Sequence, residues 1–348
     1  MRSRASAPSY WREERGLSLV EVMVTLVITL VVLAGSFRAV DDVRKAVEIG
    51  ALVSENNQSL RAAVIQITRD VMQTGRELPN AGIPVPSGAG SAALRRPAPP
   101  NVTLTFPTAW GVLPSVCPGS GLGPTINDVA TDLITVLYAD PTIDLNQWPL
   151  TAVATNGATM TVDSRTPIDG ATNGLRPGDL IWFTNAVGNA IQTVTGVSGQ
   201  GVGFASDASD TFGLNARTAA QGTILQIRSG ATFPPTSATR VLMVSYYIDT
   251  ATVAGQMRLM RRVGFGTPRL VGMGIENLQA TYDIVDGTTN PTNRADAVSP
   301  NTPSQIRKLN LFVAEQSSTA FSATRRLLRS SVATQVSMRS MSFVDRYR

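Results

Sequence analysis

The chain has 348 residues, of which 43% are hydrophobic and 16% charged, and its formal net charge is +5. This length can bury a proper core, and the low charge density excludes a charge-rich disordered protein. Histidine is absent and Cys117 is the single cysteine, which excludes an intramolecular disulfide and histidine-based catalysis. We therefore predict no enzymatic activity, no catalytic residue, no metal site and no cofactor. The small net charge gives no reason to expect nucleic-acid binding.

The N-terminal region combines a short charged leader with a long apolar run. The leader, residues 1–16, ends at Gly16, and the run extends from Leu17 to Phe37 with Glu21 as its one charged residue. As a helix, the run is about 31 Å long, which is enough to cross the hydrocarbon core of a bilayer. Arginines precede the run, so we expect a cytoplasmic N-terminus and translocation of the rest of the chain.

Glu21 is conspicuous because an ionised side chain inside a membrane span costs on the order of 3 kcal/mol. One explanation is local, since a carboxylate near a helix N-terminus gains from the macrodipole and can reach toward the headgroups. The other concerns assembly. If cleavage creates a new α-amine at Leu17, that amine needs a counter-charge in an apolar filament core. Glu21 of a neighbouring subunit can supply it.

This region resembles the N-terminus of type IV prepilins, through the run Gly16-Leu17-Ser18-Leu19-Val20-Glu21. The resemblance implies that a prepilin peptidase/N-methyltransferase cuts between Gly16 and Leu17 and methylates Leu17, and that Glu21 serves assembly. The family usually has Phe as the first mature residue, so Leu17 departs from its pattern but keeps the apolar character. Two alternatives are a secretory signal cut before Gly35 and an uncleaved signal anchor.

The helical spacing continues beyond the apolar run. Positions three and four apart form a stripe of apolar or small residues: Val40, Val43, Val47, Ala51, Ser54, Leu60, Val64, Ile67 and Val71. Charged residues, among them Asp70, are expected mostly on the other side. We predict one transmembrane and stalk helix over residues 17–75, about 87 Å long, whose second half buries this stripe against the head. The alternative is two helices with a hinge near Gly35.

Residues 76–348 are rich in turn residues and short β-like runs, so we predict a β-rich globular head. The strand candidates are Val102–Phe106, Asp132–Ala139, Thr159–Asp163, Asp179–Thr184, Ile191–Val197, Thr223–Arg228, Val241–Asp249, Gln256–Val263, Leu278–Val285, Lys308–Ala314 and Ala333–Ser340. The simplest architecture is an α+β, pilin-like fold, with the long N-terminal helix packed on a mostly antiparallel sheet.

Residues of about 140–230 are expected to form a β-rich insert in the head. The run at 176–183 resembles the turn and strand that begin a small β-barrel-like module, and the segment has the size of a small domain. Such an insert would carry partner specificity. The alternative is that these residues extend the sheet of the head.

A second resemblance, to PilW-type minor pilins, lies in the C-terminal third. It rests on residues 240–248, 258–262 and 270–282, and on a closing run at 336–341 in which Ser340 replaces the expected Asn. The resemblance implies a subunit of low abundance that joins other minor pilins and the major pilin in an initiating or tip complex. A head of about 270 residues is also too bulky to be repeated at every position of a tightly packed filament, which favours a subunit of low abundance.

The predicted function is therefore that of a minor pilin, which initiates or caps a type IV pilus after cleavage by prepilin peptidase. Residues 17–37 would anchor it in the bacterial inner membrane with the head in the periplasm, before display at the cell surface. One alternative is a J-type minor pseudopilin of type II secretion, which shares the N-terminus and a similar head. Another is a tip adhesin or DNA-uptake module. It would bind its ligand through the middle of the chain, about residues 79–239, which neither resemblance covers.

Overall fold

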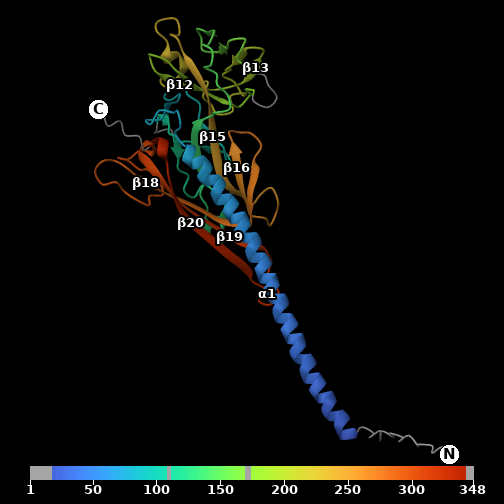
Figure 1. Cartoon of the computed structure of the whole chain (residues 1–348). Helices are drawn as coiled ribbons and strands as arrows, with labels where there is room; N and C mark the ends of the chain where they lie inside the picture. The colour runs from blue at the N-terminus through green and yellow to red at the C-terminus, as the bar shows by residue number, and fades with distance from the viewer. Residues whose placement is uncertain (1–17, 108–110, 169–173, 342–348) are drawn as a thin grey trace, which may run out of the picture.

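The computed structural model describes residues 18–107, 111–168 and 174–341 of the chain. Its first element is helix α1, Leu19–Gln73, which has 55 residues and is about 82 Å long. Figure 1 shows this helix extending from its own N-terminal end at Leu19 into the head. The helix continues through Gly35, although glycine there costs about 1 kcal/mol relative to alanine. The prediction of one long helix is confirmed, and the alternative of a hinge near Gly35 is wrong.

The C-terminal end of α1 is set by Thr74 and Gly75. Thr74 leaves the helical conformation at φ −52° and ψ 132°, and Gly75 follows at φ +74°. The left-handed region favours glycine, and a Cβ atom on Gly75 would lie 2.8 Å from Cγ of Met341. The Gly75 amide donates to the carbonyl of Leu137 at 2.9 Å. The chain therefore turns off the helix directly onto the head.

The larger sheet of the head has seven strands. They are β5 (Val116–Cys117), β8 (Ile134–Ala139), β11 (Leu180–Thr184), β12 (Asn189–Thr193), β15 (Ser237–Asp249), β16 (Arg258–Val263) and β17 (Arg269–Met273). The main order is β12-β11-β15-β16-β17, with β8 also paired to β15 and β5 to β8. Every pair is antiparallel. The long β15 joins the two ends of the sheet, since it pairs with β11 first and then with β8 and β16.

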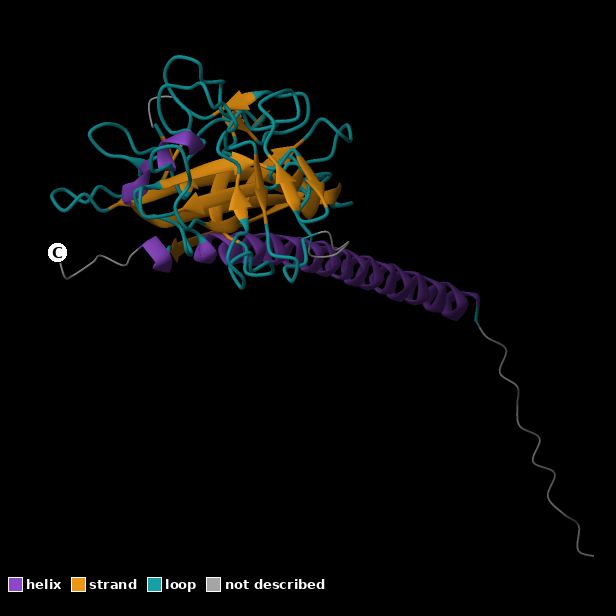
Figure 2. Cartoon of the chain, turned by 90° about the horizontal axis from the view of Figure 1, so that it is seen from above, coloured by secondary structure: helices purple, strands orange, loops and turns teal. Residues whose placement is uncertain are grey.

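The smaller sheet consists of β18 (Ile275–Ile284), β19 (Ile306–Ala320) and β20 (Leu327–Ser337), paired antiparallel in that order. Strands β19 and β20 form a long hairpin that follows α1 away from the rest of the head (Figure 1). The helix contacts β17, β19 and β20. Seen from above, it lies along one side of the sheets (Figure 2). The α+β architecture predicted from the sequence is therefore present.

Short elements complete the described part of the head. They are β1 (Ile83–Pro84), β2 (Arg95–Arg96), β3 (Leu104–Thr105), β4 (Val112–Leu113), β6 (Thr125–Ile126), β7 (Val129–Ala130), β9 (Ala152–Val153), β10 (Thr159–Thr161), β13 (Gly196–Ser198), β14 (Gly201–Gly203), and the 3₁₀ helices η2 (Ile224–Ile227), η3 (Pro303–Gln305) and η4 (Arg339–Met341). Strands β13, β14, β10 and β9 pair in that order as a separate small sheet.

The hydrophobic core is divided among several clusters. The largest lies between α1 and the two sheets, and it includes Leu60 of the helix, Tyr246 of β15 and Leu309 of β19. A second cluster is built from residues between 143 and 238, and a third from residues between 78 and 243. The helix therefore belongs to the main core of the head over its C-terminal part only.

Strands occur at most of the predicted positions, with shifted ends, but the strand predicted at Thr223–Arg228 is wrong. This segment forms η2, and its buried side chains are Ile224 and Ile227. Residues three apart share one side of a 3₁₀ helix, whereas in a strand they point to opposite faces. Burial of both isoleucines in the second cluster therefore favours the 3₁₀ helix.

Two further differences concern strand boundaries. The strand predicted at Ile191–Val197 is divided, with β12 ending at Thr193 and β13 beginning at Gly196 in another sheet. Strand β17 is not among the predicted strands, since it is only five residues long and Gly272 interrupts its apolar pattern. Gly272 packs closely on the helix, since a Cβ atom there would lie 3.3 Å from the Ser59 hydroxyl of α1.

Candidate functional site

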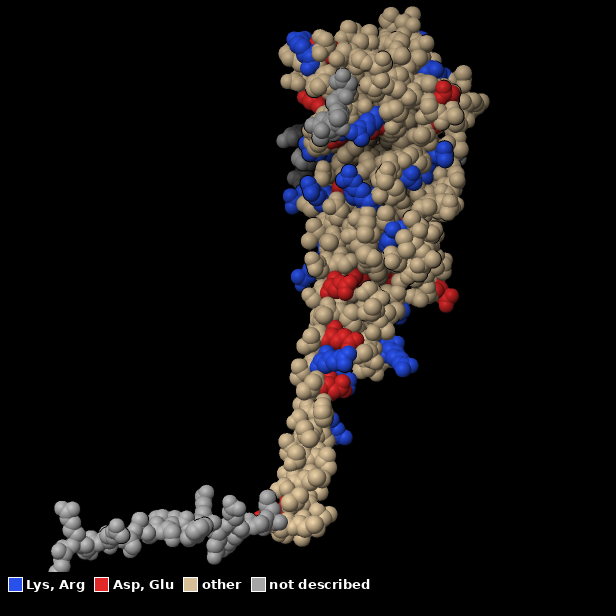
Figure 3. All heavy atoms as spheres, turned by 90° about the vertical axis from the view of Figure 1, so that its right-hand side faces the viewer, with Lys and Arg blue, Asp and Glu red and all other residues tan. Residues whose placement is uncertain are grey.

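The first half of α1 is an apolar surface that the described residues of the head leave uncovered. Every helical residue from Leu19 to Arg44 is exposed, and Leu52 is the first one that is buried. An 18-residue window of the helix has a mean hydropathy of 2.4 and no buried part. On the face shown in Figure 3, uncharged atoms cover most of this protruding segment. By its length and composition the helix can cross a membrane.

Glu21 lies in the first turn of this helix, and its side chain is exposed. The backbone N–H of Ser18, the residue before the helix, donates to Oε2 of Glu21 at 3.4 Å. An acidic group in the first turn is favourable to the helix dipole. The carboxylate thus has one weak local contact and stays open to a group outside the chain. Gly16 and Leu17, the predicted processing residues, lie outside the described residues.

The apolar stripe predicted to face the head does so only in its C-terminal part. Leu60, Ile67 and Val71 are buried, but Val40 and Val47 are 67% and 66% exposed. At about 100° per residue, Val47 and Ile67 lie about 200° apart around the helix. A strict alternation of three and four residues drifts by about 20° per heptad around an α-helix, which gives about 60° over three heptads. The step from Ser54 to Leu60 is six residues instead of seven and adds about 100° in the same direction, so a stripe that begins at Val40 does not stay on one face.

The described head leaves the valine segment of α1 uncovered. The exposed stripe of Val40, Val43 and Val47 continues the exposed apolar run into the part of the helix that lies beyond a membrane span. Exposed apolar surface of this extent marks an interaction site rather than a free surface in water. The N-terminal half of α1 therefore has the properties of an assembly surface for other apolar helices.

Asp70 anchors the helix to the head. The prediction that Asp70 lies with the other charged residues on the exposed side of the helix is therefore wrong. It is 2% exposed, and Nε of Arg261 on β16 donates to its Oδ2 at 2.6 Å. The Tyr138 hydroxyl donates to Oδ1 at 2.9 Å, and the Tyr246 hydroxyl donates to Oδ2. Burial, followed by the charge of Asp70, raises the pKa of both tyrosines. One guanidinium and two hydroxyls thus satisfy a buried carboxylate.

The position of Asp70 could have been found from the helical register. Buried Leu60, Ala63, Ile67 and Asp70 are spaced three, four and three residues apart, which places all of them on one face. The prediction treated charge as a sign of exposure and so placed Asp70 on the other side. The partner Arg261 carries no such signal, because it is 191 residues away in the sequence.

A second contact holds α1 where it leaves the head. Glu48 accepts hydrogen bonds from the amide of Ser322 at 2.9 Å and from the Ser322 hydroxyl, at the turn between β19 and β20. The Ser322 hydroxyl and amide lower the pKa of Glu48. Further along the helix, Nδ2 of Asn56 donates to the carbonyl of Leu328 at 3.3 Å. The β19–β20 hairpin therefore supports the helix as far as Glu48.

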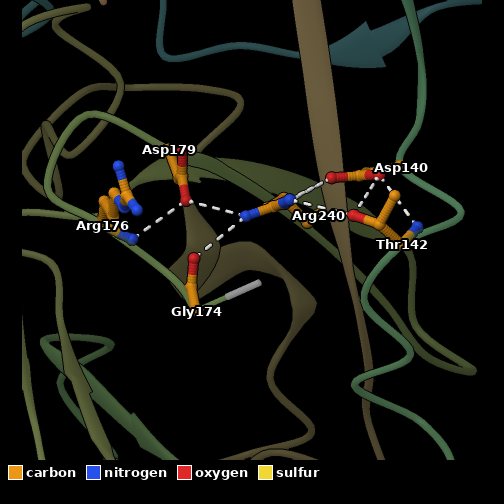
Figure 4. A network of polar contacts seen from close by, with 6 residues as sticks. All are labelled: Asp140, Thr142, Gly174, Arg176, Asp179 and Arg240. Atoms are coloured by element: carbon orange, nitrogen blue, oxygen red, sulfur yellow. Dashed lines mark hydrogen bonds and ion pairs between the residues drawn. The ribbon is translucent and has the colours of Figure 1, made fainter. Parts of the chain in front are cut away.

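A polar network centred on Arg240 of β15 joins three segments of the head (Figure 4). Its Nε donates to Oδ2 of Asp140, which follows β8, at 2.6 Å. Its Nη1 lies 3.4 Å from Oδ2 of Asp179, which precedes β11, and 3.1 Å from the carbonyl of Gly174. Its Nη2 donates to the Thr142 hydroxyl at 3.2 Å. One guanidinium thus links the segment after β8 and the segment before β11 to the first part of β15.

The two carboxylates of this network differ in their titration. Burial would raise the pKa of Asp140, but hydrogen bonds from Thr142 and Arg240 outweigh that effect and hold it below its ordinary value. Burial raises the pKa of Asp179, and the bonds from the Arg176 amide and Arg240 offset this only in part. The network has the character of a structural joint, since Arg240 pairs with the carboxylates of Asp140 and Asp179 and so ties three segments of the chain together.

The remaining chemical candidates have structural surroundings. Cys117 is buried, and burial raises the pKa of its thiol to about 12, which makes it a poor nucleophile. Trp148 is half-buried under the guanidinium of Arg165, 3.6 Å from the ring centroid. Trp182 is half-buried too, and Trp110 lies outside the described residues. Within the described ranges, no three His, Cys, Asp or Glu side chains come together as a metal site.

Comparison with known families gives a match at the N-terminus. Residues 11–37 match the family model of the prokaryotic N-terminal methylation motif, and they include Gly16, Leu17 and Glu21. No curated protein and no solved structure matches the chain significantly. The motif supports a type IV prepilin-like protein with a pilin- or pseudopilin-like role, and it implies processing by prepilin peptidase. Together with the uncovered apolar helix, it is consistent with membrane anchoring.

Proposed function

We propose that the chain is a minor pilin, which initiates or caps a type IV pilus. The observation that carries this proposal is the continuity of the methylation motif at residues 11–37 with a 55-residue helix whose first half is apolar and uncovered. Such a helix requires a bilayer before assembly and a bundle of similar helices after it, because water is a poor solvent for its surface.

In the proposed pathway, prepilin peptidase removes residues 1–16 by cutting between Gly16 and Leu17, and Leu17 is then N-methylated. Residues 17–37 hold the subunit in the inner membrane with the head in the periplasm. Other minor pilins and the major pilin then receive the subunit through the exposed half of α1. The head ends at the cell surface when the filament grows outward.

Glu21 has a specific task in this pathway. Cleavage exposes a positive α-amine at Leu17, which would be costly to bury in the apolar interior of a filament without a counter-charge. The carboxylate of Glu21 is exposed on the first turn of α1, and within the described residues it accepts one weak hydrogen bond, from Ser18. It can therefore pair with the amine of an adjacent subunit, where the low dielectric strengthens the attraction.

The assignment to the PilW-type minor subunits is supported by the C-terminal resemblance. The resembling runs at 240–248, 258–262 and 270–282 correspond to β15, β16 and to β17 with most of β18. These strands contribute to the main core that receives α1. We further propose that residues of about 140–230 form an insert with a partner-binding role. Their support is the second hydrophobic cluster, built from residues between 143 and 238.

Mass spectrometry of the N-terminus of the native protein tests this function. The expected result is a chain that begins at methylated Leu17. A start at Gly35 would show an exported soluble protein, and an intact leader would show a membrane-anchored protein that is not processed as a pilin. Either of these two results would overturn the proposal.

A further inference from the structure

A cavity of about 300 Å³ lies where α1 enters the head. It is lined by α1 from Glu55 to Ser59, by the loop before β16, by the turn between β17 and β18, and by β19 around Glu315. Burial of the helix begins at Leu52, so the cavity lies at the edge of the head next to the uncovered part of α1. The β19–β20 hairpin forms its remaining wall through Leu327.

The cavity contains a carboxylate without a counter-charge. Glu315 is 3% exposed, and its Oε2 is buried without a hydrogen-bond partner. Burial raises the pKa of Glu315 to about 7, an effect that the Ser59 hydroxyl and the Leu60 amide offset only in part. Glu55, which also lines the cavity, raises this pKa further by repulsion. No Lys or Arg is among the described residues that line the cavity.

An organic cation fits this site better than the other common ligands. Two carboxylates repel anions, and a buried unpaired carboxylate is stabilised when a positive donor pairs with it. The described side chains offer no third carboxylate, His or Cys to complete a metal site. A guanidinium or ammonium group brings both charge and N–H donors, and its flexible stem can enter a cavity of this size.

We propose that this cavity, the Glu55–Glu315 pocket, accepts an Arg or Lys side chain of a neighbouring subunit. This inference rests on the proposed function, because the uncovered half of α1 next to the pocket is then the surface on which neighbouring subunits pack. The incoming cation pairs with Glu315 in the pocket and with Glu55 at its rim. It thereby sets which subunit can dock beside this one.

The first test uses the full chain in detergent at pH 8, with arginine amide as the probe and citrulline amide as its uncharged analogue, both Nα-acetylated because a free α-amine would be partly protonated at this pH. Arginine amide is expected to raise the midpoint of thermal unfolding with increasing concentration, and citrulline amide is not. Glu315→Gln should abolish the shift, and Glu55→Gln should reduce it. Glu77→Gln, at an exposed position outside the pocket, should retain the full shift.

Three results of this test would overturn the proposal. One is an equal shift with citrulline amide, and another is an unchanged shift in Glu315→Gln. The third is no shift up to about 100 mM arginine amide, since a site with millimolar affinity must respond there by mass action. A shift produced by calcium chloride but not by arginine amide would assign the pocket to a metal ion and would also reject an organic cation.

The second test identifies the source of the cation. In cells, the double variant Glu55→Gln/Glu315→Gln is expected to show a normal N-terminus at Leu17 but several-fold lower incorporation into filaments. Unchanged incorporation would reject a neighbouring subunit as the source. An uncut leader in the wild-type chain would reject the proposed function itself. The experiments therefore distinguish a failure of the proposed function from a failure of the pocket proposal.

Discussion

Glu21 and Asp70 are carboxylates on the same helix, but their surroundings give them different tasks. Asp70 is buried, and groups of its own chain, among them Arg261, satisfy it. Glu21 is exposed, and within the described residues its contact is the amide of Ser18. The first carboxylate therefore acts in folding. The second is available for a partner outside the chain, as the assembly role proposed for it requires.

Glu21→Ala is expected to leave cleavage after Gly16 intact and to reduce incorporation into filaments at least tenfold. The reason is that the new α-amine of Leu17 loses its counter-charge in the apolar filament interior. Mass spectrometry reports the cleavage, and immunoblotting of sheared filaments reports incorporation. Asp42→Ala, at another exposed carboxylate of α1, serves as the control. Normal incorporation of Glu21→Ala would contradict the assigned role.

Asp70→Asn should lower the free energy of unfolding by about 3 kcal/mol, because the half-buried guanidinium of Arg261 would lose its buried counter-charge. Chemical denaturation of the full chain in detergent, followed by near-ultraviolet circular dichroism, measures the change. Asp42→Asn is the matched control. If the two variants unfold at the same denaturant concentration, Asp70 is not an anchor of the helix.

Glu315 should make the stability of the chain depend on pH. Its pKa is raised to about 7 in the folded state, whereas an unfolded chain has a glutamate pKa of about 4.3. The folded state therefore keeps a proton that the unfolded state loses. The stabilising contribution is complete below the unfolded value, and it disappears as the pH rises through about 7.

The measurement is the difference between the wild type and Glu315→Gln in free energy of unfolding from pH 4 to pH 8. The wild type should lose stability relative to the variant over this range, and the difference should be constant above it. A difference independent of pH would mean that the carboxyl group titrates normally in the folded state.

At the scale of elements, the glycines of α1 show that a residue type alone does not tell whether a helix continues or ends. Gly35 does not interrupt the helix, and nothing within 4 Å would meet a Cβ atom there. Gly75 ends the helix, because its φ of +74° and the nearby Met341 side chain suit a residue without a Cβ atom. The same residue type thus has opposite meanings at two positions, and the neighbouring structure decides between them.

The strands show the same dependence on context. Strand β18 was predicted well because its buried Leu278, Ala280, Tyr282 and Ile284 alternate with less buried neighbours. Strand β17 lacks such an alternation, since Leu270 and Met273 are exposed and the buried Gly272 lies against α1. Alternating burial predicts strands with one face in the core. It does not predict a strand whose place is set by a helix packed across it.

At the scale of the whole molecule, the two halves of α1 belong to different environments. The head supplies the environment of the second half through the cluster around Leu60 and Ile67. The first half has no such cover within the described residues. The Glu48 contact with Ser322 lies near the boundary between them. The molecule therefore combines a folded head with a helix segment whose surroundings come from a bilayer or from other subunits.

This division predicts that a chain beginning at Ala46 is soluble without detergent and keeps the unfolding transition of the full chain's head. The reason is that the removed helical residues contribute no buried side chain to the described core. Size-exclusion chromatography in water and thermal unfolding measure the two properties. An aggregated or already unfolded product would show that the first half of α1 takes part in the fold of the head.

The sequence by itself determined the features that depend on neighbouring residues. Hydropathy and helical spacing predicted the long helix, alternation predicted most of the strands, and Gly16, Leu17 and Glu21 stand in a local motif that a family model matches. The placement of the cut and the role of Glu21 stay predictions, since the structure tests neither.

The tertiary structure decided which face of α1 the head covers, how Asp70 is satisfied and why Glu315 lacks a counter-charge. Each of these depends on residues that are distant in the chain, such as the Asp70–Arg261 pair, whose members are 191 positions apart, and the Glu48–Ser322 pair, at 274 positions. A local pattern records whether a side chain is apolar or charged. It does not record what the folded chain brings next to it, and that neighbour sets the free energy of burying a charge.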